Sequence, residues 1–276
     1  SAAQAFEKLI REFPQSSLSR KAGIQLGLLY YNDNQPEKAL AAYKQVISNY
    51  PGSEEAKIAL QDLKSVYIDL NDINAYASYV NSIGGNIRLE VGEQDSLTYI
   101  AAEKLFMRGD NDGARRSLAG YLQTFPEGAF SSNANFYLGS IAFAKKEFDE
   151  AIQRFKLVIA SGDTKFLEES VARTAEIEYL SKDYPAALES FKRLLIVAEN
   201  PENRQAARLG IMRCALQTGQ QKDALLAADE LLKEPKLSPE LEAEARYVRA
   251  KAYIAQKQAN KALADLKELS KDTRTV

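Results

Sequence analysis

The chain has 276 residues, with 36 Lys and Arg against 38 Asp and Glu, so it lacks the basic excess with which nucleic-acid-binding proteins neutralise phosphates. It contains no histidine, which removes the commonest general base and metal ligand, and a single cysteine, which excludes an internal disulfide and a thiolate zinc site. No apolar run approaches the roughly 20 residues that cross a bilayer, so we expect no membrane insertion of this chain.

Residues 18–51 predict a pair of short helices joined by a turn. Leu26, Gly27 and Tyr30 form the apolar patch of the first helix, and the second helix can begin at Pro36, whose fixed φ suits the first turn of a helix. Helices of this length are marginal alone in water, because most of their stability comes from packing. Their apolar faces therefore need neighbours.

Two small residues determine how closely these helices approach each other. Gly27 and Ala39 lie twelve positions apart, which places both where the helices cross. A Leu at Ala39 should overpack this crossing and cost about 1–3 kcal/mol. The Ala39 position recurs along the chain at intervals of 36 to 38 residues. These positions, called the crossing positions below, are Ala2, Ala39, Tyr76, Ala114, Ala151, Ala187, Ala224 and Ala262.

Counted from the crossing positions, the whole of 1–276 forms a single array. We expect a second helix without its first at 1–14, followed by hairpins at 18–51, 53–93, 95–126, 132–163, 167–199, 202–236 and 238–272. The hairpin at 53–93 departs most from the pattern, because Tyr76 replaces the small residue. Its last stretch, 84–93, predicts a loop that is either a passive connection, a bend in the array or a partner contact. The pattern stops at the end of a hairpin, so we expect further repeats beyond Val276.

The spacing of one hairpin resembles the tetratricopeptide repeat, a helix-turn-helix unit with a large-x-x-L-G-x-x-Y signature followed by Ala, an aromatic residue and Pro. The residues at these offsets are Leu26, Gly27, Tyr30, Ala39, Tyr43 and Pro51. The resemblance implies an all-α, right-handed superhelical solenoid of about seven repeats plus an N-terminal half repeat.

The period of 36 to 38 residues exceeds the usual 34. With the pairs Phe13-Pro14, Tyr50-Pro51 and Phe125-Pro126, this period resembles the tetratricopeptide proteins of the Gram-negative cell envelope. That resemblance implies a periplasmic or envelope-associated protein, with the cytoplasm as the alternative.

No set of residues predicts catalysis, a cofactor or a metal site. Adjacent acids such as Glu168-Glu169 are expected from composition and indicate solvated helix faces. The stretch 110–113 resembles part of a calcium loop, but Tyr121 takes the place of its twelfth-position Glu, so turn chemistry explains it better. Cys214 follows Ile211 and Met212, which favours core packing over a reactive thiol.

In the tetratricopeptide fold the first helices of the hairpins line a concave groove. Its positions, transferred from the crossing residues, are Tyr31, Tyr99, Phe106, Phe136, Phe143, Glu176, Tyr179, Arg213, Tyr247 and Lys251. Aromatic anchors with a few charges suit an extended peptide or a partner helix. The alternative is that several of these rings pack between neighbouring helices.

Two functions follow from the resemblance. The first is a non-enzymatic scaffold that binds a peptide or partner protein in the groove during envelope assembly or maintenance. The second is a structural spacer in a longer chain, with the groove unused. The carboxylate clamp of co-chaperone domains is not supported, because its Lys and Asn positions hold mainly Leu28, Ser140, Glu176 and aromatic residues.

Overall fold

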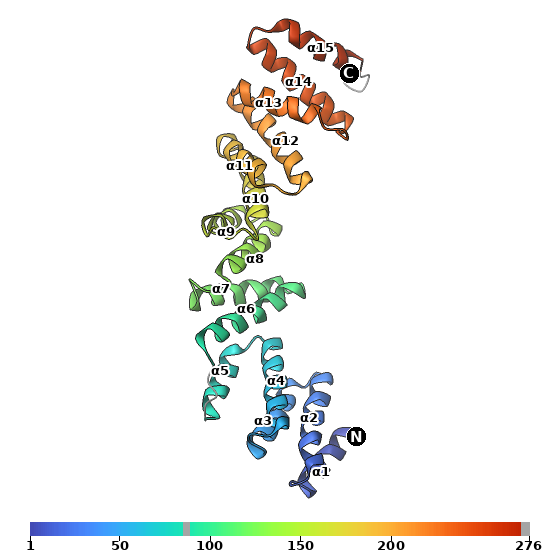
Figure 1. Cartoon of the computed structure of the whole chain (residues 1–276), viewed down its shortest axis with the longest axis vertical. Helices are drawn as coiled ribbons and strands as arrows, with labels where there is room; N and C mark the ends of the chain where they lie inside the picture. The colour runs from blue at the N-terminus through green and yellow to red at the C-terminus, as the bar shows by residue number, and fades with distance from the viewer. Residues whose placement is uncertain (85–88, 272–276) are drawn as a thin grey trace. The chain divides into compact units, whose positions relative to one another are not determined.

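A computed structural model describes residues 1–84 and 89–271, and within these ranges the chain forms fifteen α-helices and no strand (Figure 1). The predicted all-α helical-repeat fold is confirmed. The chain divides into two compact units, 1–134 and 135–276, and the boundary falls within α8.

The helices of the first unit are α1 (Ala2–Glu12), α2 (Ser17–Asn32), α3 (Pro36–Asn49), α4 (Glu54–Asp69), α5 (Ile73–Ser82), α6 (Val91–Met107) and α7 (Asn111–Thr124). After α8 (Ser131–Ala144), the second unit contains α9 (Phe148–Ala160), α10 (Leu167–Leu180), α11 (Tyr184–Val197), α12 (Pro201–Thr218), α13 (Gln221–Leu232), α14 (Pro239–Ala255) and α15 (Ala259–Ser270). Within each unit consecutive helices pack together, and the even-numbered helices also touch, α2 on α4 and α10 on α12 among them. Within each unit, therefore, the first helices of the hairpins form a layer, and each second helix packs against its neighbouring first helices.

The crossing positions lie in the core of the hairpins, as predicted. Ala39, Ala114, Ala151, Ala187 and Ala224 are each 0% exposed. The exception is Ala2, which is exposed, and α1 has no fully buried residue. α1 packs mainly on α2, and Ala2 lies on the exposed part of its surface.

Glycines on the first helices make room for aromatic rings. A Cβ on Gly27 would lie 2.4 Å from Cε1 of Tyr43, and one on Gly139 would lie 2.9 Å from Cε1 of Phe155. Since real Cβ atoms do not approach so closely, the ring occupies the volume that any larger residue would need. The Leu-Gly pairs thus mark where a ring of the second helix rests on the backbone of the first.

Every described hairpin turns through one residue with positive φ, five positions before its crossing residue. These residues are Asn34, Asn71, Gly109, Lys146, Lys182, Gly219 and Lys257, with φ between 53° and 81°. Gly and Asn tolerate this left-handed conformation, whereas Lys pays a steric cost. The recurrence gives all seven hairpins the same turn although their turn sequences differ.

The predicted loop at 84–93 is shorter in the structure. Residues 85–88 lie outside the described ranges, but α6 already begins at Val91, so the last three residues of the predicted loop are helical. Glu90 has the extended backbone of an N-cap (φ −67°, ψ 148°). Val91 and Gly92 are weak helix formers, which hid this start in the sequence.

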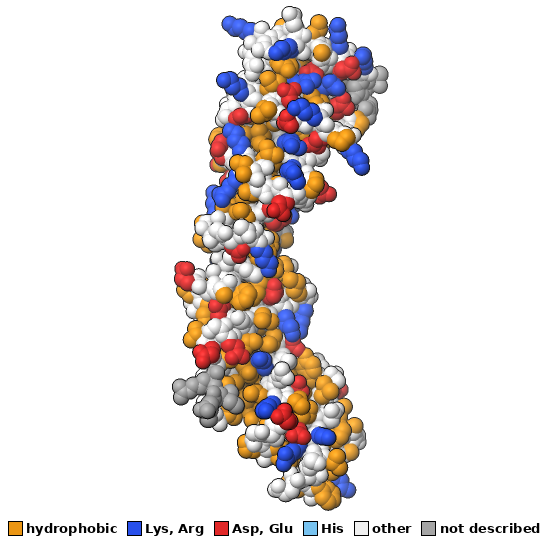
Figure 2. Space-filling model, viewed as in Figure 1, with side chains coloured by type: hydrophobic (Ala, Val, Ile, Leu, Met, Phe, Trp, Pro, Cys, Tyr) orange, Lys and Arg blue, Asp and Glu red, His pale blue; other side chains and the backbone are white. Residues whose placement is uncertain are grey.

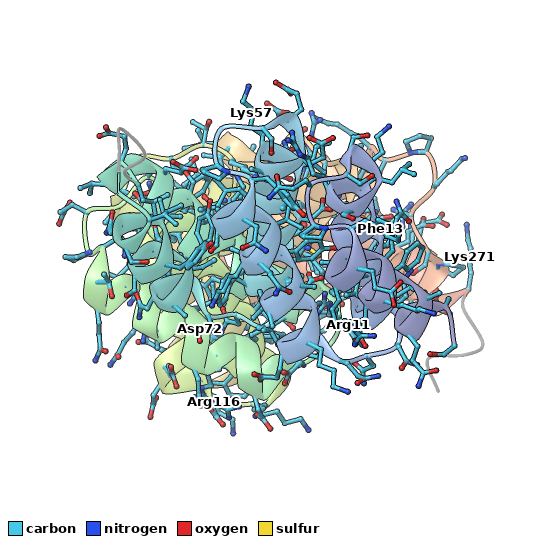
Figure 3. All side chains as sticks on the ribbon, turned by 90° about the horizontal axis from the view of Figure 1, so that it is seen from below. Arg11, Phe13, Lys57, Asp72, Arg116 and Lys271 are labelled. Atoms are coloured by element: carbon cyan, nitrogen blue, oxygen red, sulfur yellow. The ribbon has the colours of Figure 1, made fainter. Side chains whose placement is uncertain are left out.

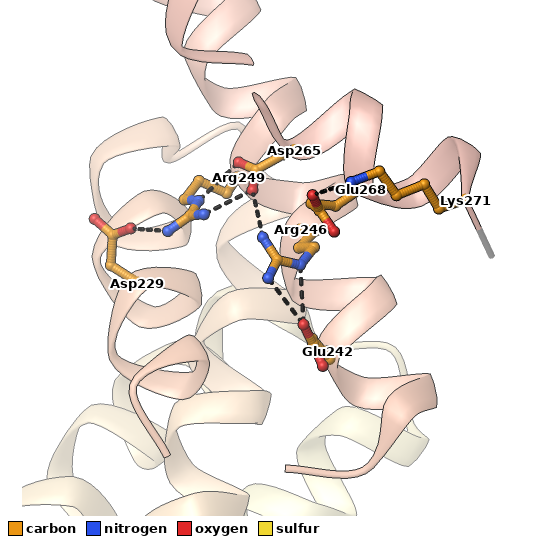
Figure 4. A network of polar contacts seen from close by, with 7 residues as sticks. All are labelled: Asp229, Glu242, Arg246, Arg249, Asp265, Glu268 and Lys271. Carbon is orange, nitrogen blue, oxygen red and sulfur yellow. Dashed lines mark hydrogen bonds and ion pairs between the residues drawn. The ribbon is translucent and has the colours of Figure 1, made fainter. Parts of the chain in front are cut away.

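A buried carboxylate ties the last three helices together (Figure 4). Asp265 is 1% exposed and accepts hydrogen bonds from Nη2 and Nε of Arg249 at 2.6 and 2.7 Å and from Nη1 of Arg246 at 3.2 Å. Arg249 also donates to Asp229 at 2.9 Å, and Arg246 to Glu242 at 2.8 Å. A buried charge of this kind is tolerated because it is paired and hydrogen-bonded. The network links α13, α14 and α15.

The structure confirms one local prediction, at Cys214, and corrects another, the predicted turn at 110–113. Cys214 is 0% exposed, and burial raises the pKa of its thiol to about 11, which fits core packing. Asp110 caps α7, its Oδ1 accepting from the N–H of Gly113 at 2.9 Å, so this stretch is a helix start. Among residues 1–84 and 89–271, no helical segment has the length and hydropathy of a bilayer span. Figure 2 shows Lys and Arg interspersed with Asp and Glu on the face in view.

Candidate functional site

A hollow of about 410 Å³ lies in the second unit between the first helices α10 and α12, with α11 at its base. Each of its two walls is a row of residues on one helix, spaced mostly three or four positions apart. Those from α10 are Glu169, Ala172, Arg173, Glu176, Tyr179 and Leu180, and those from α12 are Asn203, Ala206, Leu209, Gly210 and Arg213. The hollow brings together three residues that the sequence predicted, Glu176, Tyr179 and Arg213.

Small residues keep this hollow open. Gly210 lies directly over the ring of Phe191, where an added Cβ would approach Cδ2 to 2.4 Å. Ala172 and Ala206 on the walls leave space that longer side chains would fill. Phe191 and Leu194 of α11 give the base an apolar character.

The aromatic wall residue Tyr179 is held in place by other rings. It meets Tyr184 edge-on at 5.6 Å between ring centroids, and Phe191 at 6.4 Å. Edge-to-face contacts of this kind are favourable. The ring is only half-buried, so part of it remains available to a ligand.

Both arginines of the hollow are already paired. Arg213 donates two hydrogen bonds to Glu244 of α14, at 2.7 and 2.8 Å, and this donation raises the pKa of Arg213. Arg173 donates to Glu169 at 2.8 Å and to Glu176 at 3.1 Å. Because both arginines are already paired with carboxylates of this chain, neither is freely available to an acidic ligand in the hollow.

The other predicted residues of the second unit do not line the hollow. Phe136 is half-buried and stacks on Phe166 with the ring centroids 4.2 Å apart. Phe143 meets Phe148 edge-on at 5.8 Å, and the guanidinium of Arg173 lies 4.7 Å from its ring centroid. These two rings therefore fit the alternative given above, in which the aromatic residues pack between neighbouring helices.

On α14, Tyr247 is 52% exposed, and Nζ of the exposed Lys251 lies 5.8 Å from its ring centroid. This pair is accessible on the first helix of its hairpin. It stands apart from the hollow, whose walls come from α10 and α12.

In the first unit, Tyr31 is 38% exposed and its hydroxyl donates to Asp69 of α4. Asp69 also accepts from Nζ of Lys104 at 2.8 Å and from Nη2 of Arg108 at 3.0 Å. Burial alone would raise the pKa of Asp69, but these donors hold it below its usual value. Phe106, the third predicted residue here, is half-buried on α6.

Tyr99 requires a correction, because it is a core residue. Only 2% of it is exposed, and its ring stacks on Phe130 with the planes 2° apart and the centroids at 4.4 Å. Its hydroxyl donates to Glu103 at 2.9 Å. Phe130 lies between helices, outside the periodic pattern, so the spacing gave no sign of the ring that covers Tyr99.

Comparison with known proteins agrees with this architecture. Models of the tetratricopeptide repeat match residues 22–53 and 101–164. The chain carries tetratricopeptide repeats. These repeats support a protein-interaction scaffold with protein partners, and the repeat fold is in general non-catalytic.

Several solved structures are similar at low sequence identity. The C-terminal part of a TPR repeat-containing protein from Cytophaga hutchinsonii is 16% identical, with 92% of this chain and 96% of that chain covered and a TM-score of 0.48. MamA is 17% identical over 67% of this chain and 95% of its own, with a TM-score of 0.44. The pilF protein of Pseudomonas aeruginosa is 17% identical over 81% and 95%, with a TM-score of 0.42. A search of curated protein sequences found no match.

Proposed function

We propose that this protein is a non-enzymatic scaffold that binds an extended peptide or a helix of a partner protein in the hollow between α10 and α12. One observation carries the proposal. Two first-helix stripes face each other across an open space with an apolar base, where Glu176, Tyr179 and Arg213 converge. Aromatic and Arg side chains around a desolvated centre are typical of binding hot spots.

The hollow suits recognition because its polar and aromatic groups are already positioned. Tyr179 rests against Tyr184 and Phe191, and Arg213 is fixed by its two hydrogen bonds to Glu244. Ordering side chains on binding costs about 0.5–1.5 kcal/mol each. A site that has already met this cost needs fewer favourable contacts from its ligand.

The long repeat period and the Tyr-Pro and Phe-Pro helix ends support a place in the bacterial cell envelope, in its assembly or maintenance. Fractionating cells that express the native gene tests this part. Recovery with periplasmic or envelope fractions is the expected result, and recovery with cytoplasmic markers would contradict it.

Filling the hollow from its rim tests the proposal. Ala206 is exposed and lines the hollow, so Ala206→Arg should block it without disturbing the core. Ala264→Arg makes the same change at an exposed site on α15 and serves as the control. Peptides selected by display of random sequences against the full chain are then titrated against each variant.

We expect Ala206→Arg to weaken binding of the selected peptides at least tenfold, while Ala264→Arg leaves it unchanged. Equal binding by both variants would overturn the assignment of this hollow. If selection yields no peptide that depends on the hollow, the spacer function is favoured instead.

A further inference from the structure

A second depression lies between two of the second helices. It has a volume of about 590 Å³ and runs between α11 and α13, with α12 at its base. Its lining consists of Lys192 and Leu195 from α11, Arg204, Arg208 and Ile211 from α12, and Asp223, Leu226, Ala227 and Glu230 from α13. On each helix these residues recur mostly every three or four positions, so they form a row along one face of that helix. We call this depression the trough.

The trough exposes a leucine where the other repeats carry polar or small residues. Leu226, two positions after the crossing residue Ala224, is 63% exposed. Its counterparts are Ala41, Ser78, Arg116, Gln153, Glu189 and Ala264. Figure 3 shows one of them, Arg116, extending outward from the helices. The fold therefore does not require a large apolar side chain here.

Ile196 on α11 departs from the repeat in the same way. It lies nine positions after its crossing residue, next to the trough residue Leu195, and is 84% exposed. Its counterparts in the described part of the chain are Arg11, Ser48, Gln123, Ala160, Lys233 and Lys271. Contiguous exposed apolar residues on a charged surface mark interaction sites. This second departure lies on α11, the helix that forms the other wall of the trough.

The charged side chains that line the trough are in ion pairs, except Arg204. Lys192 pairs with Asp223 at 2.9 Å and with Glu189 at 3.4 Å, and Glu230 pairs with Lys233 at 2.7 Å. Arg208 pairs with Glu234 at 3.1 Å. Each of these groups therefore already has a partner within the chain.

Arg204 is exposed and donates to the carbonyl of Glu199 at 2.7 Å, but forms no ion pair with a carboxylate in the described ranges. Its charge acts on Glu168, whose oxygens already accept from the N–H groups of Glu199 and Asn200 and from Asn203. The trough therefore offers one cation to a ligand carboxylate.

We propose that the trough binds an amphipathic helix of a partner protein, with Leu226 and Leu195 facing its apolar stripe and Arg204 facing an Asp or Glu at the edge of that stripe. A depression between two helices with a third at its base matches helix-in-groove recognition, in which apolar anchors recur every three or four residues. This site is separate from the hollow between α10 and α12, and its occupant is acidic where it meets Arg204.

The probe is a displayed library of helix-forming 18-residue peptides, selected against the full chain and titrated against variants. Leu226→Gln removes the apolar anchor at an exposed site, and Leu263→Gln, at a 51% exposed leucine of α15, is the matched control. Arg204→Glu reverses the charge. Ala206→Arg, which blocks the hollow, shows which site a peptide uses.

We expect the selection to yield acidic amphipathic peptides. Their binding should weaken at least tenfold in Leu226→Gln and in Arg204→Glu, and should be unchanged in Leu263→Gln and in Ala206→Arg. Selected peptides that are basic, or that bind Leu226→Gln as well as they bind the unaltered chain, would overturn the proposal. Sedimentation equilibrium adds a further outcome. If the unaltered chain dimerises and Leu226→Gln is monomeric, a second copy covers the trough and the proposal is wrong.

Discussion

The hairpins α2–α3 and α4–α5 solve the same packing problem in different ways. In the first, Gly27 and Ala39 let the helices meet along their length. In the second, the equivalent positions hold Lys64 and Tyr76, and α4 and α5 meet over only a short stretch. Close helix contact is lost where both positions are large. It survives in α12–α13, where the large Met212 faces the small Ala224, so one small residue is enough for a close crossing.

Tyr76 nevertheless became a core residue. It is 4% exposed, and its ring lies 6.1 Å from that of Tyr67 at an angle of 49°. The ring fills the space that the wider crossing leaves. α5 is also shorter than α3, with 10 residues against 14.

The largest expected effect comes from removing that ring. Tyr76→Ala should leave a cavity among the buried residues around this ring and cost about 3 kcal/mol. Native-state hydrogen exchange of the α4 and α5 amides measures the loss in the helices where it occurs. A loss below about 1 kcal/mol would mean that α5 moves in to close the gap.

A smaller effect is expected from enlarging the close crossing. Gly27→Leu would place its Cβ 2.4 Å from the Tyr43 ring, so overpacking should cost about 1–3 kcal/mol, even though Leu favours helix by nearly 1 kcal/mol over Gly. Lys64→Leu at the equivalent site of the second hairpin should change stability by no more than about 0.5 kcal/mol. Urea denaturation of both variants provides the comparison. Equal losses would show that the two crossings are alike.

The smallest effect concerns the turns, which the two hairpins share. Asn34 and Asn71 have φ of 55° and 53°, and Asn tolerates this conformation, so glycine at either site should change stability by less than about 0.5 kcal/mol. Lys182 has φ of 61° and should gain roughly 0.5–1 kcal/mol on Lys182→Gly. Thermal unfolding of the three variants tests this. A large change at only one of the asparagines would locate the difference between the hairpins in the turn.

The sequence predicted those parts of the fold that depend on spacing. The crossing alanines, the close approach at Gly27 and the buried Cys214 all follow from helical periodicity and residue size. The left-handed lysines were not predictable, because Lys carries no turn signal of its own and adopts this conformation only where the packed helices impose it.

The candidate site was predictable only in part. Counting along the repeat nominated Glu176, Tyr179 and Arg213, but not the hollow, whose space depends on Ala172, Ala206 and Gly210 of two helices together. Tyr99 was misplaced because Phe130 covers it from a segment outside the pattern. The trough could not be recognised from the sequence, because Leu226 and Ile196 look like core residues there. Only the structure shows that both side chains are exposed.

Binding in the hollow can be located by hydrogen–deuterium exchange of the intact chain, with and without a saturating concentration of a selected peptide. We expect the peptide to add protection in α10 and α12 around Tyr179 and Arg213, and to add none there in the Ala206→Arg variant. Protection confined to other helices, or protection of α10 and α12 that persists in Ala206→Arg, would contradict binding in the hollow.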